Sequence, residues 1–158
     1  MAEKKVSKAI EKKDVKKPVK KAEPKVIDIS RFFNVTREKE GVWYEPKING
    51  VPLGLELKVL GPSAEAVRKA AVEYDKVHDK NAKIFESDPG RALDLEQEAL
   101  AKRASAAVVD IRGARGNVIK IDGKPLEFSK EIIERLFFEN GDITGDVLAA
   151  SVNTDLFK

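Results

Sequence analysis

The stretch GVWYEPKINGVPLGLELKVL, residues 41–60, carries the strongest local signal in the chain. Asn49 and Gly50 lie between two apolar runs, and this pair favours a two-residue hairpin turn because both residues adopt a positive φ readily. In the second run, apolar residues alternate with small or charged ones at Leu53, Leu55, Leu57 and Val59. Such alternation gives a strand one buried face and one wet face. We therefore expect an antiparallel β-hairpin over residues 41–60, with an unpaired stretch or a sheet edge at Pro46 and Pro52.

Two long helices are expected next. Ser63 follows a Gly-Pro pair and is the predicted N-cap of a helix over residues 64–86, which contain no proline or glycine. The sequence SDPG at residues 87–90 breaks this helix, and a second helix is predicted from Arg91 to Ile111. Each helix has an apolar stripe at helical spacing: Val67, Ala70, Ala71, Tyr74, Val77, Ala82 and Phe85 in the first, and Leu93, Leu100, Ala104, Ala107, Val108 and Ile111 in the second. The pattern indicates a helical hairpin over residues 63–112.

The C-terminal part, residues 117–158, repeats the alternation of turn and helix on a smaller scale. A short hairpin is predicted around Asp122 and Gly123, followed by a helix from Lys130 to Glu139 with Ser129 as its cap. A last helix is predicted from about Thr144 to Thr154. The chain is thus expected to form one α+β domain over residues 26–158, mainly α-helical, with small antiparallel β-hairpins.

The first 25 residues differ from the rest in charge. They contain ten lysines and four acidic residues, a net charge of +6, which leaves −3 on the other 133 residues. Two prolines and few apolar residues predict a disordered tail, because so little apolar surface cannot offset the entropy of ordering. The tail is either an electrostatic arm for nucleic acid or another acidic partner, or a solvated leader. Its candidate contact residues are Lys12, Lys13, Lys16, Lys17, Lys20 and Lys21.

Composition excludes several classes of chemistry. The chain has no cysteine and one histidine, so it cannot build a disulfide framework, a cysteine zinc site or a thiol nucleophile. No metal site and no cofactor are expected. No apolar run approaches the roughly 20 residues that span a bilayer, so no membrane partner is expected. The N-terminus also lacks the apolar core of a signal peptide.

Candidate catalytic patterns are weak. The acidic pairs Glu96 with Glu98 and Asp142 with Asp146 have the residue types for acid/base catalysis, but such pairs arise by chance among 27 acidic residues. The sequence RGARG at residues 112–116 resembles a phosphate-binding loop but lacks the glycine spacing of one. It is interpreted as a helix stop and turn. We expect a protein that is not an enzyme.

Aromatic side chains on the predicted helices are the better candidates for function. Adjacent residues on a helix point about 100° apart, so Phe137 and Phe138 cannot both face the centre of one narrow stripe. One of them is expected in the core and the other at a partner, unless a wide buried face covers both. Tyr74 and Phe85 are the other two candidate partner-binding residues, and the four together are expected to include both core and contact positions.

The order of these features resembles that of tail assembly chaperones of long-tailed, siphovirus-type bacteriophages. The resemblance rests on LKVLGPS at residues 57–63 leading into VRKAA at 67–71, and on IDGKPLEFS at 121–129 leading into EIIERL at 131–136. VLAA at residues 147–150 and a closing Phe157 complete it.

The resemblance implies a non-enzymatic protein that binds the tape-measure protein, the tail-tube protein or both, and assists tail tube assembly in the cytoplasm of the bacterial host. Two other classes stay open. One is a nucleic-acid-binding accessory protein that uses the basic tail, and the other is a structural tail component of the virion. The oligomeric state is not predicted.

Overall fold

The computed structural model describes residues 35–158, so the predicted disordered tail and its lysines lie outside the described residues. The architecture is α+β and mainly helical, as predicted. The elements in chain order are α1 (Val35–Glu40), β1 (Val42–Tyr44), β2 (Lys47–Ile48), β3 (Val51–Pro52), β4 (Leu55–Val59), α2 (Glu65–Phe85), α3 (Pro89–Ala106), β5 (Val108–Gly113), η2 (Ala114–Gly116), β6 (Lys120–Ile121), β7 (Lys124–Pro125), α4 (Lys130–Glu139), α5 (Gly141–Val152) and η3 (Thr154–Phe157).

The hairpin predicted over residues 41–60 is present. Its part near the turn, β2 and β3, forms one sheet, and its outer part, β1 and β4, belongs to another. Asn49 and Gly50, at φ of 52° and 79°, turn the chain between β2 and β3, where Ile48 pairs with Val51. Further out, β1 pairs with β4 and β4 pairs with β5, which gives a three-stranded antiparallel sheet in the order β1-β4-β5. Residues 45–46 and 53–54 separate the two ladders, so Pro46 lies in an unpaired stretch, whereas Pro52 pairs with Lys47 at the end of β3 in a two-stranded sheet, which has only edge strands.

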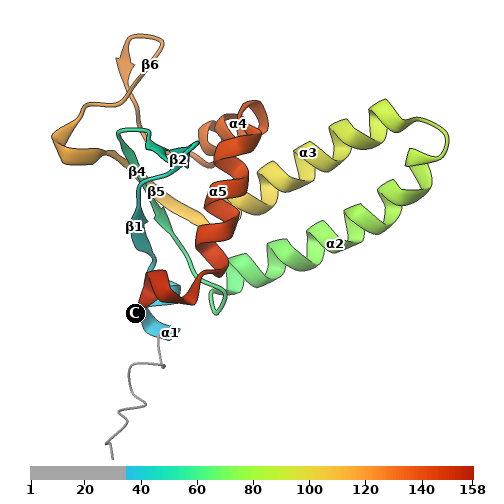
Figure 1. Cartoon of the computed structure of the whole chain (residues 1–158), viewed down its shortest axis with the longest axis horizontal. Helices are drawn as coiled ribbons and strands as arrows, with labels where there is room; N and C mark the ends of the chain where they lie inside the picture. The colour runs from blue at the N-terminus through green and yellow to red at the C-terminus, as the bar shows by residue number, and fades with distance from the viewer. Residues whose placement is uncertain (1–34) are drawn as a thin grey trace, which may run out of the picture.

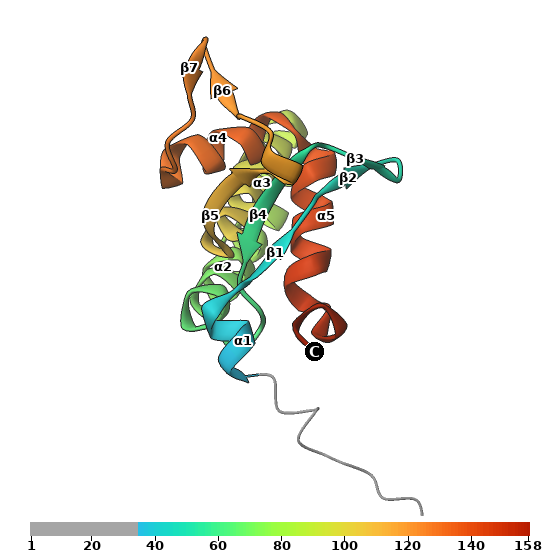
Figure 2. The same ribbon diagram turned by 90° about the vertical axis from the view of Figure 1, so that its left-hand side faces the viewer.

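The core lies between this sheet and the helices behind it. Figure 2 shows the sheet facing the viewer, with α3 and α5 on its far side. Leu57 and Val59 on β4 are fully buried, as the alternation predicts. They share one cluster with residues from four other elements: Ala101, Ala104, Val108, Ile133, Phe137, Ile143 and Val147.

The second long helix ends earlier than predicted, because its last four predicted residues, 108–111, belong to a strand. Helix α3 ends at Ala106, and the residues from Val108 onward form β5 beside β4. Val108, Val109 and Ile111 are β-branched and favour a strand, and the Leu60 N–H donates to the Ala107 carbonyl at 2.7 Å where the two strands meet. The predicted helical hairpin over residues 63–112 is therefore wrong at its C-terminal end.

Two further boundaries differ from the prediction. Ala64 is the N-cap of α2, and its side chain makes no capping bond. Ser63 instead donates its backbone N–H to Glu38 Oε2 at 2.9 Å, which ties α1 to the start of α2. Helix α5 begins at Gly141, three residues before the predicted Thr144, directly after α4.

The remaining predicted turns and caps are confirmed. The hairpin β6–β7 turns at Asp122 and Gly123. Ser129 caps α4 by accepting a hydrogen bond from the Ile132 N–H at 3.2 Å. Lys130 in the first turn of α4 donates from Nζ to the carbonyls of Ser105 and Val108, so its cation lies at the C-terminal end of α3.

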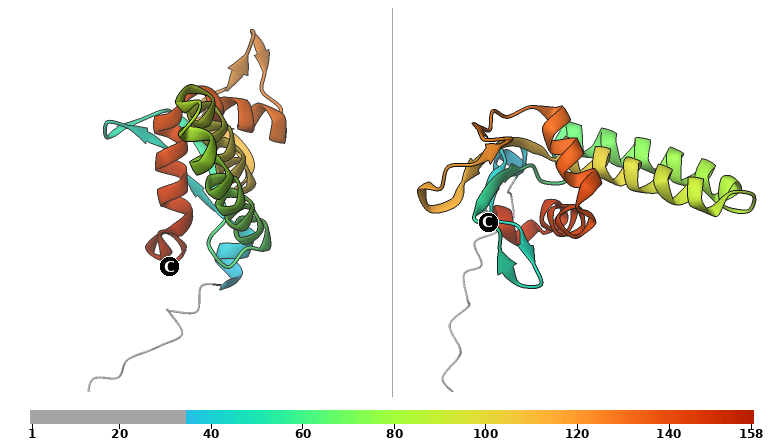
Figure 3. Two further views of the ribbon diagram at one scale, coloured as in Figure 1. Left: turned by 90° about the vertical axis from the view of Figure 1, so that its right-hand side faces the viewer. Right: turned by 90° about the horizontal axis from the view of Figure 1, so that it is seen from above.

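Helices α2 and α3 project from the body as a long arm (Figure 1). Helix α2 packs mainly against α3, whereas α3 also contacts α4 and α5 at the base of the arm. The view from above shows the outer part of the arm standing away from the sheet and from the C-terminal helices (Figure 3, right). No helix within residues 35–158 is long and apolar enough to cross a membrane.

Candidate functional site

The arm is built from small side chains and a capped turn. Ala92 and Ala99 on α3 are buried against α2, and such small residues let two helices approach closely. At the far end, Asp88 accepts a hydrogen bond from the Arg91 N–H at 3.0 Å, and Pro89 occupies the first turn of α3. The sequence SDPG therefore both stops α2 and starts α3.

A polar cluster centred on Glu96 joins the two helices midway along the arm. The Glu96 carboxylate accepts hydrogen bonds from the Tyr74 hydroxyl, from His78 Nδ1 at 3.0 Å and from Asn81 Nδ2 at 3.4 Å. Burial raises the pKa of Glu96, but these three hydrogen bonds outweigh it, so the net pKa lies below the ordinary value. The cluster fixes the register of α2 against α3.

Tyr74, one of the predicted contact residues, is part of this cluster. Burial, the hydrogen bond to Glu96 and the Glu96 charge raise the pKa of Tyr74 to about 12. The Arg103 guanidinium lies 5.1 Å from the centre of the Tyr74 ring, and the His78 ring stacks on it with centroids 5.9 Å apart. Both the hydroxyl and the ring of Tyr74 thus have partners within the arm.

Phe85, the second predicted contact residue, lines an apolar groove near the far end of the arm. We call this the arm groove, and its lining residues are His78, Asn81, Ala82, Phe85, Ala92, Leu93 and Glu96. The Phe85 side chain is 52% exposed and that of Leu93 is 61% exposed. Two large apolar side chains are thus exposed on one groove, outside the core cluster.

The adjacent pair Phe137 and Phe138 is divided between the core and the surface, so no wide buried face covers both. Phe137 is buried in the core cluster, so it belongs to the core part of that expectation. Phe138 is 43% exposed and lines a hollow between α3 and α4. Gln97 on α3 donates from Nε2 to the Phe138 carbonyl across the two helices. The hollow adjoins the base of the arm.

Three of the four residues in the acidic pairs named in the sequence have structural partners. Glu98 pairs with Lys102 at 2.8 Å, whereas Glu96 faces α2. Asp146 accepts hydrogen bonds from the Tyr44 hydroxyl at 2.8 Å and from the Lys47 N–H at 2.9 Å. Within residues 35–158, no group of three His, Cys, Asp or Glu residues is placed to hold a metal ion.

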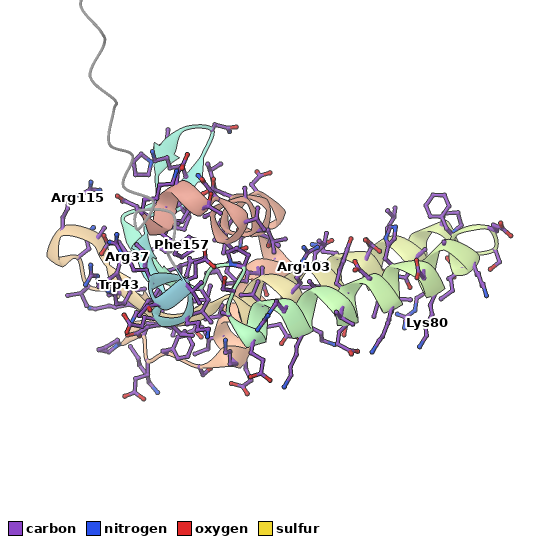
Figure 4. All side chains as sticks on the ribbon, turned by 90° about the horizontal axis from the view of Figure 1, so that it is seen from below. Arg37, Trp43, Lys80, Arg103, Arg115 and Phe157 are labelled. Atoms are coloured by element: carbon purple, nitrogen blue, oxygen red, sulfur yellow. The ribbon has the colours of Figure 1, made fainter. Side chains whose placement is uncertain are left out.

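The RGARG segment spans the end of β5 and the 3₁₀ turn η2, and its predicted role as a helix stop is wrong. Arg115 adopts a φ of 54° in a short 3₁₀ turn and pairs with Glu45 at 3.0 Å. Arg112 pairs with Glu56 and lies 4.0 Å from the centre of the Trp43 ring. Both arginines thus brace the sheet, and Figure 4 shows Trp43 and Arg115 at the end of the molecule opposite the arm.

Sequence reasoning missed Leu93 as an exposed residue. It was placed on the apolar stripe of the second helix, yet nothing in the described residues covers this outer part of the arm. Hydrophobic periodicity does not reveal this exposure, because an apolar stripe on an isolated hairpin has the same spacing as one inside a core.

Comparisons of the chain with protein-family models, with curated proteins and with solved structures find no match.

Proposed function

We propose that the protein is a non-enzymatic chaperone of phage tail assembly, and that the arm is the surface by which it binds its client. The observation that carries the proposal is the arm groove. Phe85 and Leu93 line this groove, and both side chains are exposed to solvent because the outer part of the arm does not pack against the body. The clients implied by the sequence resemblance are the tape-measure protein and the tail-tube protein.

A helical client suits the shape of this surface. A third helix laid along the groove would complete a three-helix bundle with α2 and α3, in the manner of an amphipathic helix in an apolar groove. Each large apolar side chain that becomes buried contributes about 1.5–3 kcal/mol. A tape-measure protein offers a long helix with an apolar stripe, and covering that stripe would keep it soluble before the tube encloses it.

The rigidity of the arm supports the same role. The Glu96 cluster joins α2 to α3 at the groove itself, because His78, Asn81 and Glu96 also line it, so the groove is held in one geometry before a client arrives. A preformed groove costs less ordering entropy on binding than one that must form on contact.

The test is co-expression of the full chain with the tape-measure protein and, separately, with the tail-tube protein encoded beside it. The proposal predicts a soluble complex that persists at moderate salt, because apolar burial is not screened. A complex that forms only at low salt and contains nucleic acid would favour the alternative function, an accessory protein that binds nucleic acid through its lysines. Stoichiometric recovery from finished particles would favour a structural tail component.

A further inference from the structure

We propose that Asn49 is a site of spontaneous deamidation, at which the turn of the β2–β3 hairpin is converted to aspartate and isoaspartate as the protein ages. The chain has two Asn-Gly pairs, Asn49 with Gly50 and Asn140 with Gly141. The sequence makes them equivalent, because in both the residue after asparagine has no side chain to obstruct the reaction. The fold makes them different. Asn49 lies in the body, so the reaction does not depend on the arm groove.

The reaction needs only water and a base. The backbone nitrogen of the glycine loses its proton and attacks Cγ of the asparagine side chain. A succinimide ring forms as the N–Cγ bond is made, and the side-chain nitrogen leaves as ammonia. Water then opens the ring at either carbonyl, which gives aspartate or isoaspartate, each with one more negative charge than asparagine. Ring closure therefore requires a side-chain amide that is not held elsewhere and a peptide unit that can rotate toward it.

The Asn49 side chain has this freedom. Residues 35–158 contain five asparagines, and Asn49 is an exposed one. The other four each have a side chain that is held by a hydrogen bond, and these are Asn81, Asn117, Asn140 and Asn153. Within the described residues, no such bond holds the Asn49 amide. A Cβ added at Gly50 would meet nothing within 4 Å, so the space around the attacking nitrogen is also open.

The peptide unit between Asn140 and Gly141 is fixed at the start of α5. The Asn140 carbonyl accepts the Thr144 N–H at 3.1 Å and shares the Thr144 hydroxyl proton with the Phe137 carbonyl. The Asn140 side chain donates from Nδ2 to the Leu136 carbonyl at 2.9 Å, in the last turn of α4. Ring closure here would break these bonds, and breaking bonds in a partly buried site costs free energy. The junction of the two helices therefore protects Asn140.

The hairpin that carries Asn49 opens more easily. Strands β2 and β3 form a two-stranded sheet of two residue pairs, Lys47 with Pro52 and Ile48 with Val51. An isolated pair of short strands is marginally stable, and Pro52 has no N–H to donate to its partner. Figures 2 and 3 show the tip of this hairpin reaching out from the body. Asn49, at a φ of 52°, can thus leave its turn conformation for ring closure without unfolding of the core.

Deamidation loosens the hairpin from α5. The turn faces the start of α5 across a hollow whose lining includes Asn49, two carboxylates (Asp142 and Asp146) and one cation (Lys47). A new carboxylate at residue 49 adds to this excess of negative charge, and like charges at close range repel. Isoaspartate also lengthens the backbone by one carbon, so the two-residue turn loses the geometry that pairs β2 with β3. Both changes weaken the contact in which the Lys47 N–H donates to Asp146.

Peptide mapping of the aged full chain tests the proposal. The protein is kept folded in mildly alkaline buffer, digested with trypsin and compared with an unaged sample by mass spectrometry. Asn49 lies in the tryptic peptide 48–58 and Asn140 in the peptide 136–158, where fragment ions assign the modified residue. The mass gain from amide to acid should build up at Asn49 on the order of tenfold faster than at Asn140, because the hairpin opens more often than the helix junction. No gain at Asn49, or one no faster than at Asn140, would overturn the proposal.

Unfolded protein is the control for local sequence. In denaturant both Asn-Gly pairs lose their structure, so their two rates should become similar. A preference for Asn49 that persists unchanged in denaturant would come from the neighbouring residues and would contradict the role of the fold. The pair Asp122 and Gly123 can form the same ring at the β6–β7 turn, but it loses water and regains it, so its mass does not change.

Two variants test the loosening of the hairpin. Asn49→Gly keeps a residue that adopts a positive φ and removes the reactive amide, whereas Asn49→Asp adds the charge without lengthening the backbone. Hydrogen exchange of the Lys47 amide should be faster in the aged parent than in the fresh parent. It should be intermediate in fresh Asn49→Asp, and ageing should not change it in Asn49→Gly. Exchange at Lys47 that is the same in deamidated and fresh parent would contradict the loosening.

Discussion

Tyr44 in β1 donates its hydroxyl proton to Asp146 Oδ2 in α5 at 2.8 Å, which links the sheet to the C-terminal helix across 102 residues of sequence. The same carboxylate accepts the Lys47 N–H at 2.9 Å, just before the β2–β3 turn. Asp146 thus fixes both the outer strand and the turn against α5. Removing the Asp146 carboxylate leaves two donors, the Tyr44 hydroxyl and the Lys47 N–H, without this acceptor. Removing the Tyr44 hydroxyl leaves the carboxylate with its second donor, the Lys47 N–H.

Substitutions of Tyr44 and of Asp146 are expected to lower the free energy of unfolding by different amounts. Tyr44→Phe should lower the free energy of unfolding by about 1 kcal/mol, the net worth of one hydrogen bond. Asp146→Ala should cost more, about 1–3 kcal/mol, because partly buried donors lose their acceptor. Denaturant unfolding of both variants and of the double variant measures the coupling between them. Equal costs for the two single variants would contradict the arrangement.

Both tyrosines of the chain are expected to titrate above the ordinary range. Burial and a carboxylate acceptor raise the pKa of Tyr44, and likewise of Tyr74, from 10.0 to about 12. Because the folded state holds these protons more tightly than the unfolded state, their contribution to stability is complete below pH 10 and declines as the pH rises to 12. The absorbance of phenolate during an alkaline titration of folded protein measures this. A transition at the ordinary value for either tyrosine would show that its hydroxyl is not held.

Gly113 is expected to tolerate no side chain. A Cβ at this position would lie 1.7 Å from the Asn117 carbonyl oxygen, so the backbone after β5 would have to move. Gly113→Ala should therefore lower the free energy of unfolding by roughly 2 kcal/mol or more, because the new methyl group would overpack against backbone atoms. The matched control is Gly145→Ala in α5, where a Cβ meets nothing within 4 Å. This control should stabilise by up to about 1 kcal/mol through helix propensity.

The Glu96 cluster should stabilise the arm more than the body. Glu96→Ala removes the acceptor of Tyr74, His78 and Asn81 and should cost about 1–3 kcal/mol, with faster hydrogen exchange in α2 and α3 than in the sheet. Glu96→Gln keeps an acceptor oxygen and should cost less. Since the pKa of Glu96 is lowered from 4.5, its contribution is present above that pH and is lost as the pH falls. An exchange pattern that changes equally over the whole chain would contradict a local role.

Local sequence signals predicted the turns and caps well. Asn49 with Gly50, Asp122 with Gly123 and the Ser129 cap all depend on a few neighbouring residues, and the structure has them where they were expected. Ser63 failed as a cap because a distant residue, Glu38, binds its backbone N–H. A contact between residues 25 positions apart leaves no mark on local propensity.

Tertiary contacts also explain the longer error. The segment from Val108 to Ile111 continues a helical apolar stripe and is also rich in β-branched residues, so its sequence fits either state. Pairing with β4 stabilises the strand conformation of this segment. The arm groove was predicted only in part, through Phe85, because exposure depends on what the rest of the chain leaves uncovered.

Client binding by a variant of the arm groove would show whether the arm holds the client. Phe85→Ser with Leu93→Ser should weaken the complex on the order of 100-fold or more while thermal unfolding stays near that of the parent, since both side chains are largely exposed. The matched control is Val51→Ser with Val118→Ser, two exposed apolar residues away from the arm, and it should bind as the parent does. Undiminished binding by the Phe85 and Leu93 variant would contradict the claim that the arm holds the client.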